Sequence, residues 1–371
     1  MFYRLICFWL IISSFGIIFF PGQSSFLRLS GFLFLVYRDG IVKRELRIIA
    51  LTTIILLAYY LTYFQLGIIS FYITLIFSVL CCKYLRHEMF ISEFIKVTYI
   101  FAKLILLLAV ISILINSFQT IALNTSTYSA IGPFLYTYLP STVLNFNYHR
   151  PVLFFQEPGS LQIFFIISLY YEGSKGRFFG KKYLIFSAAV IAGYSSVGML
   201  SLVFITVYFA LKQDRLGYRG LIMIFPLLMS YPLFIDNYDD KFNGENSQSS
   251  VARIVDIYNG YDLFLEKPFF GHGLITMEEY AQLIGKEYYL EFFPTDRITQ
   301  ESIRSRGNSV GILNILFSFG LLGLLVFIIP FLFLMKQNFM LKVVMLMFLF
   351  SQPVIFTPFV IVFLYSLTIK M

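Results

Sequence analysis

Apolar runs long enough to cross a membrane follow one another along this chain, and a single long polar stretch interrupts them. The chain is 58% apolar and 13% charged, whereas soluble domains are roughly 45 to 50% apolar and about 25% charged. Each membrane-spanning helix needs about 20 apolar residues, so the length allows about twelve helices and one extramembrane unit. The sequence therefore predicts an all-α polytopic membrane protein. We place its spans at 5–20, 22–37, 47–65, 66–82, 95–117, 151–171, 183–195, 196–211, 219–235, 308–334, 340–352 and 354–369.

Basic residues gather in alternate connections between these spans, which the positive-inside rule assigns to the cytoplasm. Arg4 and Lys370 place both termini on the same side. The basic residues of the connections are Arg38, Lys43, Arg44, Arg47, Lys83, Arg86, Lys175, Arg177, Lys181, Lys182, Lys212, Arg215, Arg219, Lys336 and Lys342. The segments 118–150 and 236–306 then face outward.

The polar stretch, residues 236–306, contains 13 of the 20 acidic residues and 7 of the 28 basic ones. An apolar period at Val251, Ile254 and Val255 predicts a helix there, and the glycines of residues 267–273 predict a tight turn after it. The first outer segment reads as a loop with one interfacial helix near 134–138. Because its tyrosines suit headgroup depth, we expect it to lie at the membrane surface.

This pattern divides the chain into five regions. They are an N-terminal transmembrane scaffold (1–117), a periplasmic loop (118–150), central transmembrane helices (151–235), a large periplasmic loop unit containing short helices (236–306) and C-terminal transmembrane helices (307–371).

The composition excludes several classes of function. The formal charge of +8 comes from cytoplasmic loop ends and not from a basic face with stacking aromatics, so no nucleic-acid partner is expected. Cys7, Cys81 and Cys82 form no metal-binding pattern, and the sequence lacks the nucleotide-binding and hydrolase motifs. We therefore expect no cofactor and no metal.

The first candidate site joins Arg150, at the outer mouth of a predicted span, to Glu157 seven residues later. A carboxylate within a membrane span is costly and commonly marks a function. The alternative is that Arg150 extends toward the headgroups and that residues 157–159 only interrupt a helix.

Further candidates lie in and after the outer unit. Arg253 carries a fixed fork of donors suited to a diphosphate, and His272 is a candidate general base, because the unperturbed pKa of histidine lies near neutral pH. Each is also compatible with a purely structural role. Arg304 and Arg306 stand where the chain re-enters the membrane, just before Asn308.

These motifs, in this order, resemble the O-antigen polymerase and ligase superfamily, specifically the Wzy-type polymerases. The resemblance covers about residues 145–330. It rests on Arg150 to Glu157-Pro158, Ser195-Ser196 to Gly198, Arg253, Lys267-Pro268 to Gly271-His272-Gly273, Asn308, and Gly320 to Gly323. Relatives often have His-Asn where this chain has Gly307-Asn308, so no catalytic histidine is carried over there; His272 or His149 could substitute.

The resemblance implies a GT-C-like glycosyltransferase of the bacterial inner membrane, with its active site facing the periplasm. It would transfer a growing glycan from undecaprenyl diphosphate to the non-reducing end of an incoming lipid-linked unit, with inversion at the anomeric carbon. Its partners would be those lipid-linked oligosaccharides, membrane lipid and a polysaccharide chain-length regulator. The implied roles are diphosphate binding by Arg150, Arg253, Arg304 and Arg306, catalysis by Glu157 or His272, and substrate positioning by His149 and Asn308.

Two alternatives remain open at this point. An O-antigen ligase, which moves finished glycan to lipid A core, shares the topology and the long outer loop. The Glu157-Pro158 sequence after Arg150 favours the polymerase. A non-enzymatic flippase of lipid-linked oligosaccharides would also have about twelve helices, but two similar halves and no such outer unit are expected for it.

Overall fold

The computed structural model describes most of the helices and the first outer segment. It covers residues 2–14, 24–41, 43, 46–47, 49–50, 53–54, 57, 67–84, 87–114, 119–123, 126–132, 135–143, 146–153, 155, 158–212, 247–274, 310–329, 339–351 and 357–368. The predicted span at 219–235 lies outside these residues, and the one at 47–65 lies mostly outside them.

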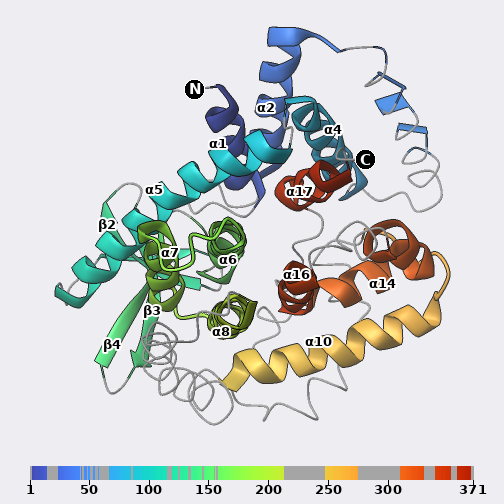
Figure 1. Cartoon of the computed structure of the whole chain (residues 1–371). Coiled ribbons are helices and arrows are strands. Elements are labelled where there is room, and N and C mark those ends of the chain that lie inside the picture. The colour runs from blue at the N-terminus through green and yellow to red at the C-terminus, as the bar shows by residue number, and fades with distance from the viewer. Residues whose placement is uncertain are drawn as a thin grey trace.

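Apolar helices occupy most of the predicted spans (Figure 1). They are α1 (Phe2–Ser14), α2 (Ser24–Asp39), α4 (Gly67–Tyr84), α5 (His87–Leu114), α6 (Pro158–Ser174), α7 (Lys181–Ala192), α8 (Ser196–Lys212), α14 (Gly311–Gly323) continued by the π-helix η1 (Leu324–Ile328), α16 (Phe339–Ser351) and α17 (Pro358–Thr368). The helix predicted in the outer unit is α10 (Ser247–Glu266). The prediction of a largely helical, apolar chain is confirmed.

Two described helical segments, Glu88–Ser112 and Gly311–Ile328, are long and apolar enough to cross a membrane. Shorter apolar helices accompany them at Phe2–Ser14, Ile69–Cys82, Ser196–Lys212 and Phe339–Ser351. The total of twelve spans and the GT-C-like arrangement stay predictions.

The first outer segment is a sheet, and the predicted loop with an interfacial helix near 134–138 is wrong. Strands β1 (Gln119–Leu123), β2 (Ser126–Gly132), β3 (Leu135–Val143) and β4 (Phe146–Leu153) pair antiparallel in the order β1-β2-β3-β4. The reason lies in composition, because the tyrosines and threonines assigned to headgroup depth also favour extended backbone. In the sequence, the strands are separated by residue types that favour turns, namely Asn124, Pro133 and Asn145.

This sheet corrects two further expectations. The chain is not wholly α-helical, and the region predicted as a single span at 151–171 begins as β4, with α6 starting only at Pro158. Arg150 therefore lies on a strand and not at the mouth of a helix. Strand β4 packs on α5, one of the two long apolar helices.

Aromatic rings hold the centre of the helical bundle together. Phe359 of α17 lies 5.0 Å from Phe94 of α5 and 4.7 Å from Phe164 of α6, between ring centroids. All three side chains are fully buried. A hydroxyl pair between Thr98 and Ser168, 2.7 Å apart, also joins α5 to α6. Ring pairs of this kind stabilise by about 0.5 to 1.5 kcal/mol beyond their buried area, so α17 is fixed to the middle of the bundle.

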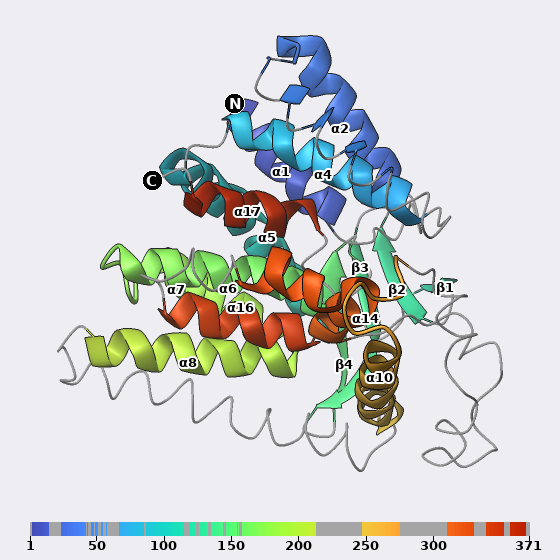
Figure 2. The same ribbon diagram turned by 90° about the vertical axis from the view of Figure 1, so that its right-hand side faces the viewer.

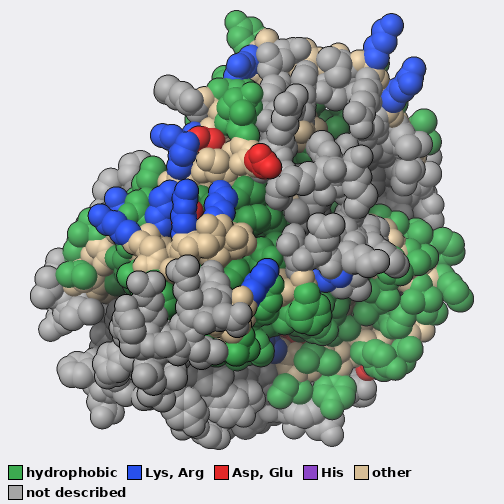
Figure 3. Space-filling model, in the orientation of Figure 1, with side chains coloured by type: hydrophobic (Ala, Val, Ile, Leu, Met, Phe, Trp, Pro, Cys, Tyr) green, Lys and Arg blue, Asp and Glu red, His purple; other side chains and the backbone are tan. Residues whose placement is uncertain are grey.

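The two ends of the bundle differ in character. Figure 2 shows α6, α7, α8 and α16 side by side, with the sheet and α10 at one end. The α6–α7 connection and the last residue of α8 lie at the other end, where Lys175, Arg177, Lys181 and Lys212 are exposed. Figure 3 shows lysine and arginine side chains gathered on that face. Which side of the membrane each end faces stays a prediction.

Candidate functional site

The outer helix α10 is fixed to the bundle by a backbone clasp at a break in α14. The break occurs at Gly320, whose φ of 61° and ψ of −151° are not helical. Two helical hydrogen bonds, from Leu321 to Phe317 and from Leu322 to Ser318, are replaced by bonds to the turn that follows α10. The N–H groups of His272 and Gly273 donate to the carbonyls of Phe317 and Ser318 at 2.7 and 2.9 Å.

The turn also accepts the N–H groups that the break releases. Leu321 donates to the Pro268 carbonyl at 2.7 Å, and Leu322 donates to the Phe269 carbonyl at 3.3 Å. Four hydrogen bonds thus cross between the turn and α14, and the buried backbone groups stay satisfied. The motif glycines that the sequence singled out, Gly271 and Gly320, serve this contact.

Both glycines are needed because two backbones approach closely. A Cβ on Gly320 would lie 2.5 Å from the Pro268 oxygen, and one on Gly271, where φ is 72°, would lie 2.4 Å from the Ser318 carbonyl carbon. The φ/ψ combination at Gly320 is also essentially restricted to glycine. The clasp therefore depends on the absence of side chains at these two positions.

His272 lies inside the clasp. Its side chain is buried, and Nε2 is 2.9 Å from the Leu263 carbonyl and 3.3 Å from a Glu266 carboxylate oxygen. A carbonyl accepts only, so Nε2 carries a proton and donates it to Leu263. Burial lowers the pKa of His272. This geometry suits a group that ties the end of α10 to its own turn, which is a positioning role.

The side of α10 that faces the protein combines apolar residues, Val255 and Leu263, with two polar ones, while its exposed side is mostly apolar. Asp256 and Asn259 are 0% and 4% exposed, whereas Ile257, Tyr258 and Tyr261 are about half exposed. Among the described residues, the Asn259 amide nitrogen has no hydrogen-bond partner. Because α10 packs against the candidate span α14, its exposed apolar side suits a helix lying in a membrane surface.

The two arginines expected to bind diphosphate lie on different elements at one end of the molecule. Arg150 is on β4 and Arg253 is on α10, and both are partly buried. Figure 2 places β4 and α10 at the end of the bundle away from the α6–α7 connection. Glu157, Arg304, Arg306 and Asn308, together with the His149 side chain, lie outside the described residues.

A buried amide lies near the start of α6. Gln162 is 1% exposed, and its Nε2 donates to the Val190 carbonyl at 3.0 Å, but its Oε1 has no partner among the described residues. A Cβ on Gly198 would fall 1.4 Å from that oxygen. The motif glycine Gly198 thus makes room for Gln162. Our sequence reasoning overlooked Gln162, although a glutamine inside an apolar run was the available signal.

The apolar helices indicate a membrane protein in which α10 and the turn after it are clasped to a candidate span. A family model described as O-antigen ligase matches residues 183–328. The match runs from α7 to η1, and so includes Arg253, the turn of residues 267–273 and Gly320. It confirms the resemblance found in the sequence and supports membership of the O-antigen polymerase and ligase superfamily. No curated protein and no solved structure matches the chain.

Replacing Gly320 tests the clasp. Gly320→Ala forces a side chain into a glycine-only conformation and against the backbone of residues 268 and 269, so we expect a loss of about 3 kcal/mol or more of stability. Thermal unfolding of the purified protein in detergent measures it. Gly176→Ala is the matched control, because φ there is 71° but a Cβ would meet nothing within 4 Å; about 1 kcal/mol is expected. Equal losses in the two variants would contradict the clasp.

Acidification tests the burial of His272. Burial lowers the pKa of His272 in the folded protein. As pH falls, the unfolded chain therefore binds a proton at this histidine before the folded chain does. The stability that the neutral, buried His272 contributes is lost as pH falls below about 6.5. The melting temperature of the wild type should fall more steeply from pH 7 to pH 5 than that of His272→Gln, whose amide can still donate to Leu263. Stabilisation of the wild type by acid, relative to the variant, would show that pairing with Glu266 outweighs burial.

Proposed function

We propose that this protein polymerises lipid-linked oligosaccharide repeat units as a glycosyltransferase. It would transfer the growing glycan from undecaprenyl diphosphate to the non-reducing end of an incoming unit carried on the same lipid. The family match supports an enzyme of the polymerase or ligase type. The observation that carries the proposal is the clasp at Gly320, which holds the Arg253-bearing helix α10 against a candidate membrane span within the matched region.

The proposed reaction makes electrostatic demands that suit the arginines. As the bond from the anomeric carbon to the diphosphate oxygen breaks, negative charge grows on the leaving diphosphate. Guanidinium groups stabilise such charge through paired, permanently charged donors. We assign this role to Arg150, Arg253, Arg304 and Arg306. In this proposal the arginines make a metal ion unnecessary.

The attacking sugar hydroxyl must lose a proton as it bonds to the anomeric carbon. We assign Glu157 as the general base, because His272 already uses its Nε2 proton in a structural hydrogen bond to Leu263. Attack from the face opposite the diphosphate would invert the anomeric centre. His149 and Asn308 are proposed to position the acceptor.

The apolar exposed side of α10 supports a location at the membrane surface. Lipid-linked donors and acceptors both carry their diphosphates at headgroup depth, with the polyprenyl chain in the bilayer. A helix whose exposed side is apolar can lie at that depth, which would bring Arg253 level with the diphosphate. The outer unit would then act as a cover over the site, in a bacterial inner membrane with both termini cytoplasmic. A chain-length regulator is the expected protein partner.

Ligation to lipid A core is the second candidate, and the family match, whose model is described as O-antigen ligase, is compatible with both reactions. The two reactions use the same donor and the same leaving group, and they differ only in the acceptor. Glu157-Pro158 after Arg150 is the sequence feature that favours polymerisation. The acceptor used by the purified protein decides between them.

An assay with purified protein tests the proposal. Given only lipid-linked repeat units, without nucleotide sugar or added divalent metal, the wild type should lengthen them, as measured by gel separation of the products. Arg253→Ala should lower the rate by about 100-fold, as loss of one transition-state donor commonly does, and Arg253→Lys should restore it only in part.

Lys175→Gln is the matched control, since it removes an exposed cation at the opposite end of the bundle; full activity is expected. Lengthening that is unchanged in Arg253→Ala would contradict the diphosphate role. Transfer to lipid A core with no lengthening would establish the ligase instead.

A further inference from the structure

An arginine that the proposed reaction does not use lies between α1, α2 and α4. Arg28 of α2 is partly buried, and its Nε donates to the Ser13 carbonyl at 3.0 Å. Its Nη1 donates to the Thr74 hydroxyl at 2.7 Å, and that hydroxyl donates to the Ser70 carbonyl at 2.8 Å. A guanidinium has five N–H donors, so the contacts with described residues use only two of them.

Arg28 has no acidic partner among the residues that the structure describes. A cation inside an apolar helix is costly unless an anion or water compensates it. The Ser13 carbonyl, in the last turn of α1, supplies only the partial negative charge of a helix end. The hydroxyls nearby, including Ser25 and Ser70 bonded at 2.7 Å, are neutral. The charge of Arg28 therefore lacks a full counter-charge within this part of the chain.

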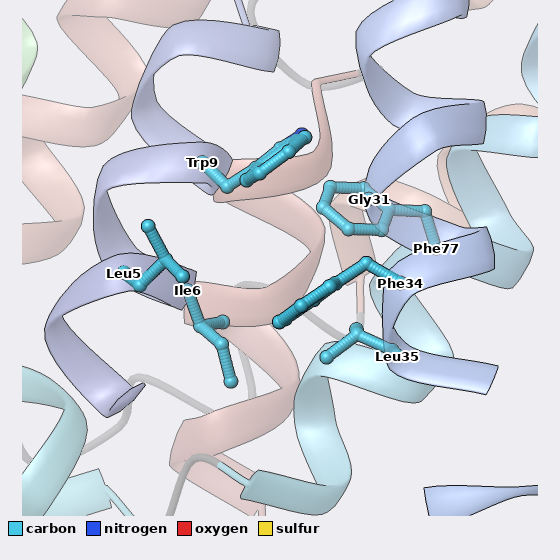
Figure 4. A pocket seen from close by; sticks show the side chains of 7 residues that line it. All are labelled: Leu5, Ile6, Trp9, Gly31, Phe34, Leu35 and Phe77. Atoms are coloured by element: carbon cyan, nitrogen blue, oxygen red, sulfur yellow. The ribbon is translucent and has the colours of Figure 1, made fainter. Parts of the chain in front are cut away.

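An apolar groove lies next to Arg28, between the same three helices (Figure 4). Its lining residues are Leu5, Ile6 and Trp9 of α1, Gly31, Phe34 and Leu35 of α2, and Phe77 of α4. On α2, Gly31 comes three residues after Arg28, and on α4, Phe77 comes three residues after Thr74. On α1, Trp9 comes four residues before Ser13. On each helix, the residue that lines the groove therefore lies about one turn, or roughly 5 Å along the helix axis, from the residue that makes the polar contact.

The groove is open and free of unpaired polar groups among its lining side chains. The Trp9 indole nitrogen donates to the Leu27 carbonyl at 2.7 Å, and Leu5 and Phe34 are about 40% exposed. The enclosed space is about 10 Å³, about one water-sized sphere, so a hydrocarbon chain would lie along the groove rather than inside it. A Cβ on Gly31 would lie 2.7 Å from the Phe77 ring and 2.9 Å from Trp9.

We propose that Arg28 and this groove bind a phospholipid of the bilayer, with its phosphate on the guanidinium and one acyl chain against Trp9 and Phe34. The predicted orientation puts the α1–α2 connection outside, so Arg28 lies at the headgroup side and the groove lies deeper. The charge favours a phospholipid, since one guanidinium neutralises one phosphodiester. A polyprenyl diphosphate would keep uncompensated charge at this position.

Native mass spectrometry of the full chain in detergent tests this proposal. The probes are phosphatidylglycerol, diacylglycerol, which has the same tails without the phosphate, and a polyprenyl diphosphate. Wild type should bind phosphatidylglycerol and not diacylglycerol. Arg28→Gln should weaken phosphatidylglycerol binding by about tenfold or more, since a charge-assisted hydrogen-bond pair is lost.

Arg38→Gln is the matched control, because Arg38 lies exposed at the other end of α2, over the Phe2 ring; binding as in wild type is expected. Equal binding by Arg28→Gln and wild type, or equal binding of diacylglycerol and phosphatidylglycerol, would overturn the proposal. So would a polyprenyl diphosphate that displaces phosphatidylglycerol from wild type.

A second variant keeps the test decisive if Arg28→Gln does not fold. Thr74→Val keeps a similar volume and removes the hydroxyl that holds the guanidinium. It should weaken phosphatidylglycerol binding in the same direction, and unchanged binding in a folded Thr74→Val protein would count against the site.

Discussion

The exchange of backbone hydrogen bonds at Gly320 is the constraint on which the outer part of this protein depends. Without a side chain, residue 320 can leave the helical conformation and admit the turn that follows α10. The break would otherwise leave two donors and two acceptors unsatisfied in an apolar setting, where each costs several kcal/mol. Because the turn of residues 268–273 satisfies all four groups, α10 gains a fixed position on α14.

This constraint changes how the motifs of the chain are interpreted. Gly271, His272 and Gly320 lie within the family match, yet each serves the contact between α10 and α14. Among the described residues, the remaining candidates for chemistry are Arg150 on β4 and Arg253 on α10, which come from separate elements at one end of the bundle. Reactions that release a diphosphate depend on placing positive charge accurately. A clasp that fixes α10 is consistent with that requirement.

The sequence predicted the parts of this structure that hydrophobic periodicity controls. Helices such as α5 and α14 follow from long apolar runs, and α10 with its turn follows from Val251, Val255 and the glycines of residues 267–273. The sheet was missed because tyrosine and threonine suit both strands and membrane surfaces. The break at Gly320 could not be predicted, since a glycine in an apolar helix is also compatible with close helix packing. Arg28 was missed because only the fold brings Ser13 and Thr74 beside it.

The central claim is that α10 and the basic connections lie on opposite sides of the membrane. Labelling of single cysteines with a membrane-impermeant reagent tests it directly, in a chain whose Cys7, Cys81 and Cys82 are replaced. Lys267, directly after α10, and Lys175 of the α6–α7 connection are both exposed. Lys267→Cys should be labelled from the periplasm of intact cells, and Lys175→Cys only after the inner membrane is made permeable. Labelling of both cysteines from the same side would contradict the account.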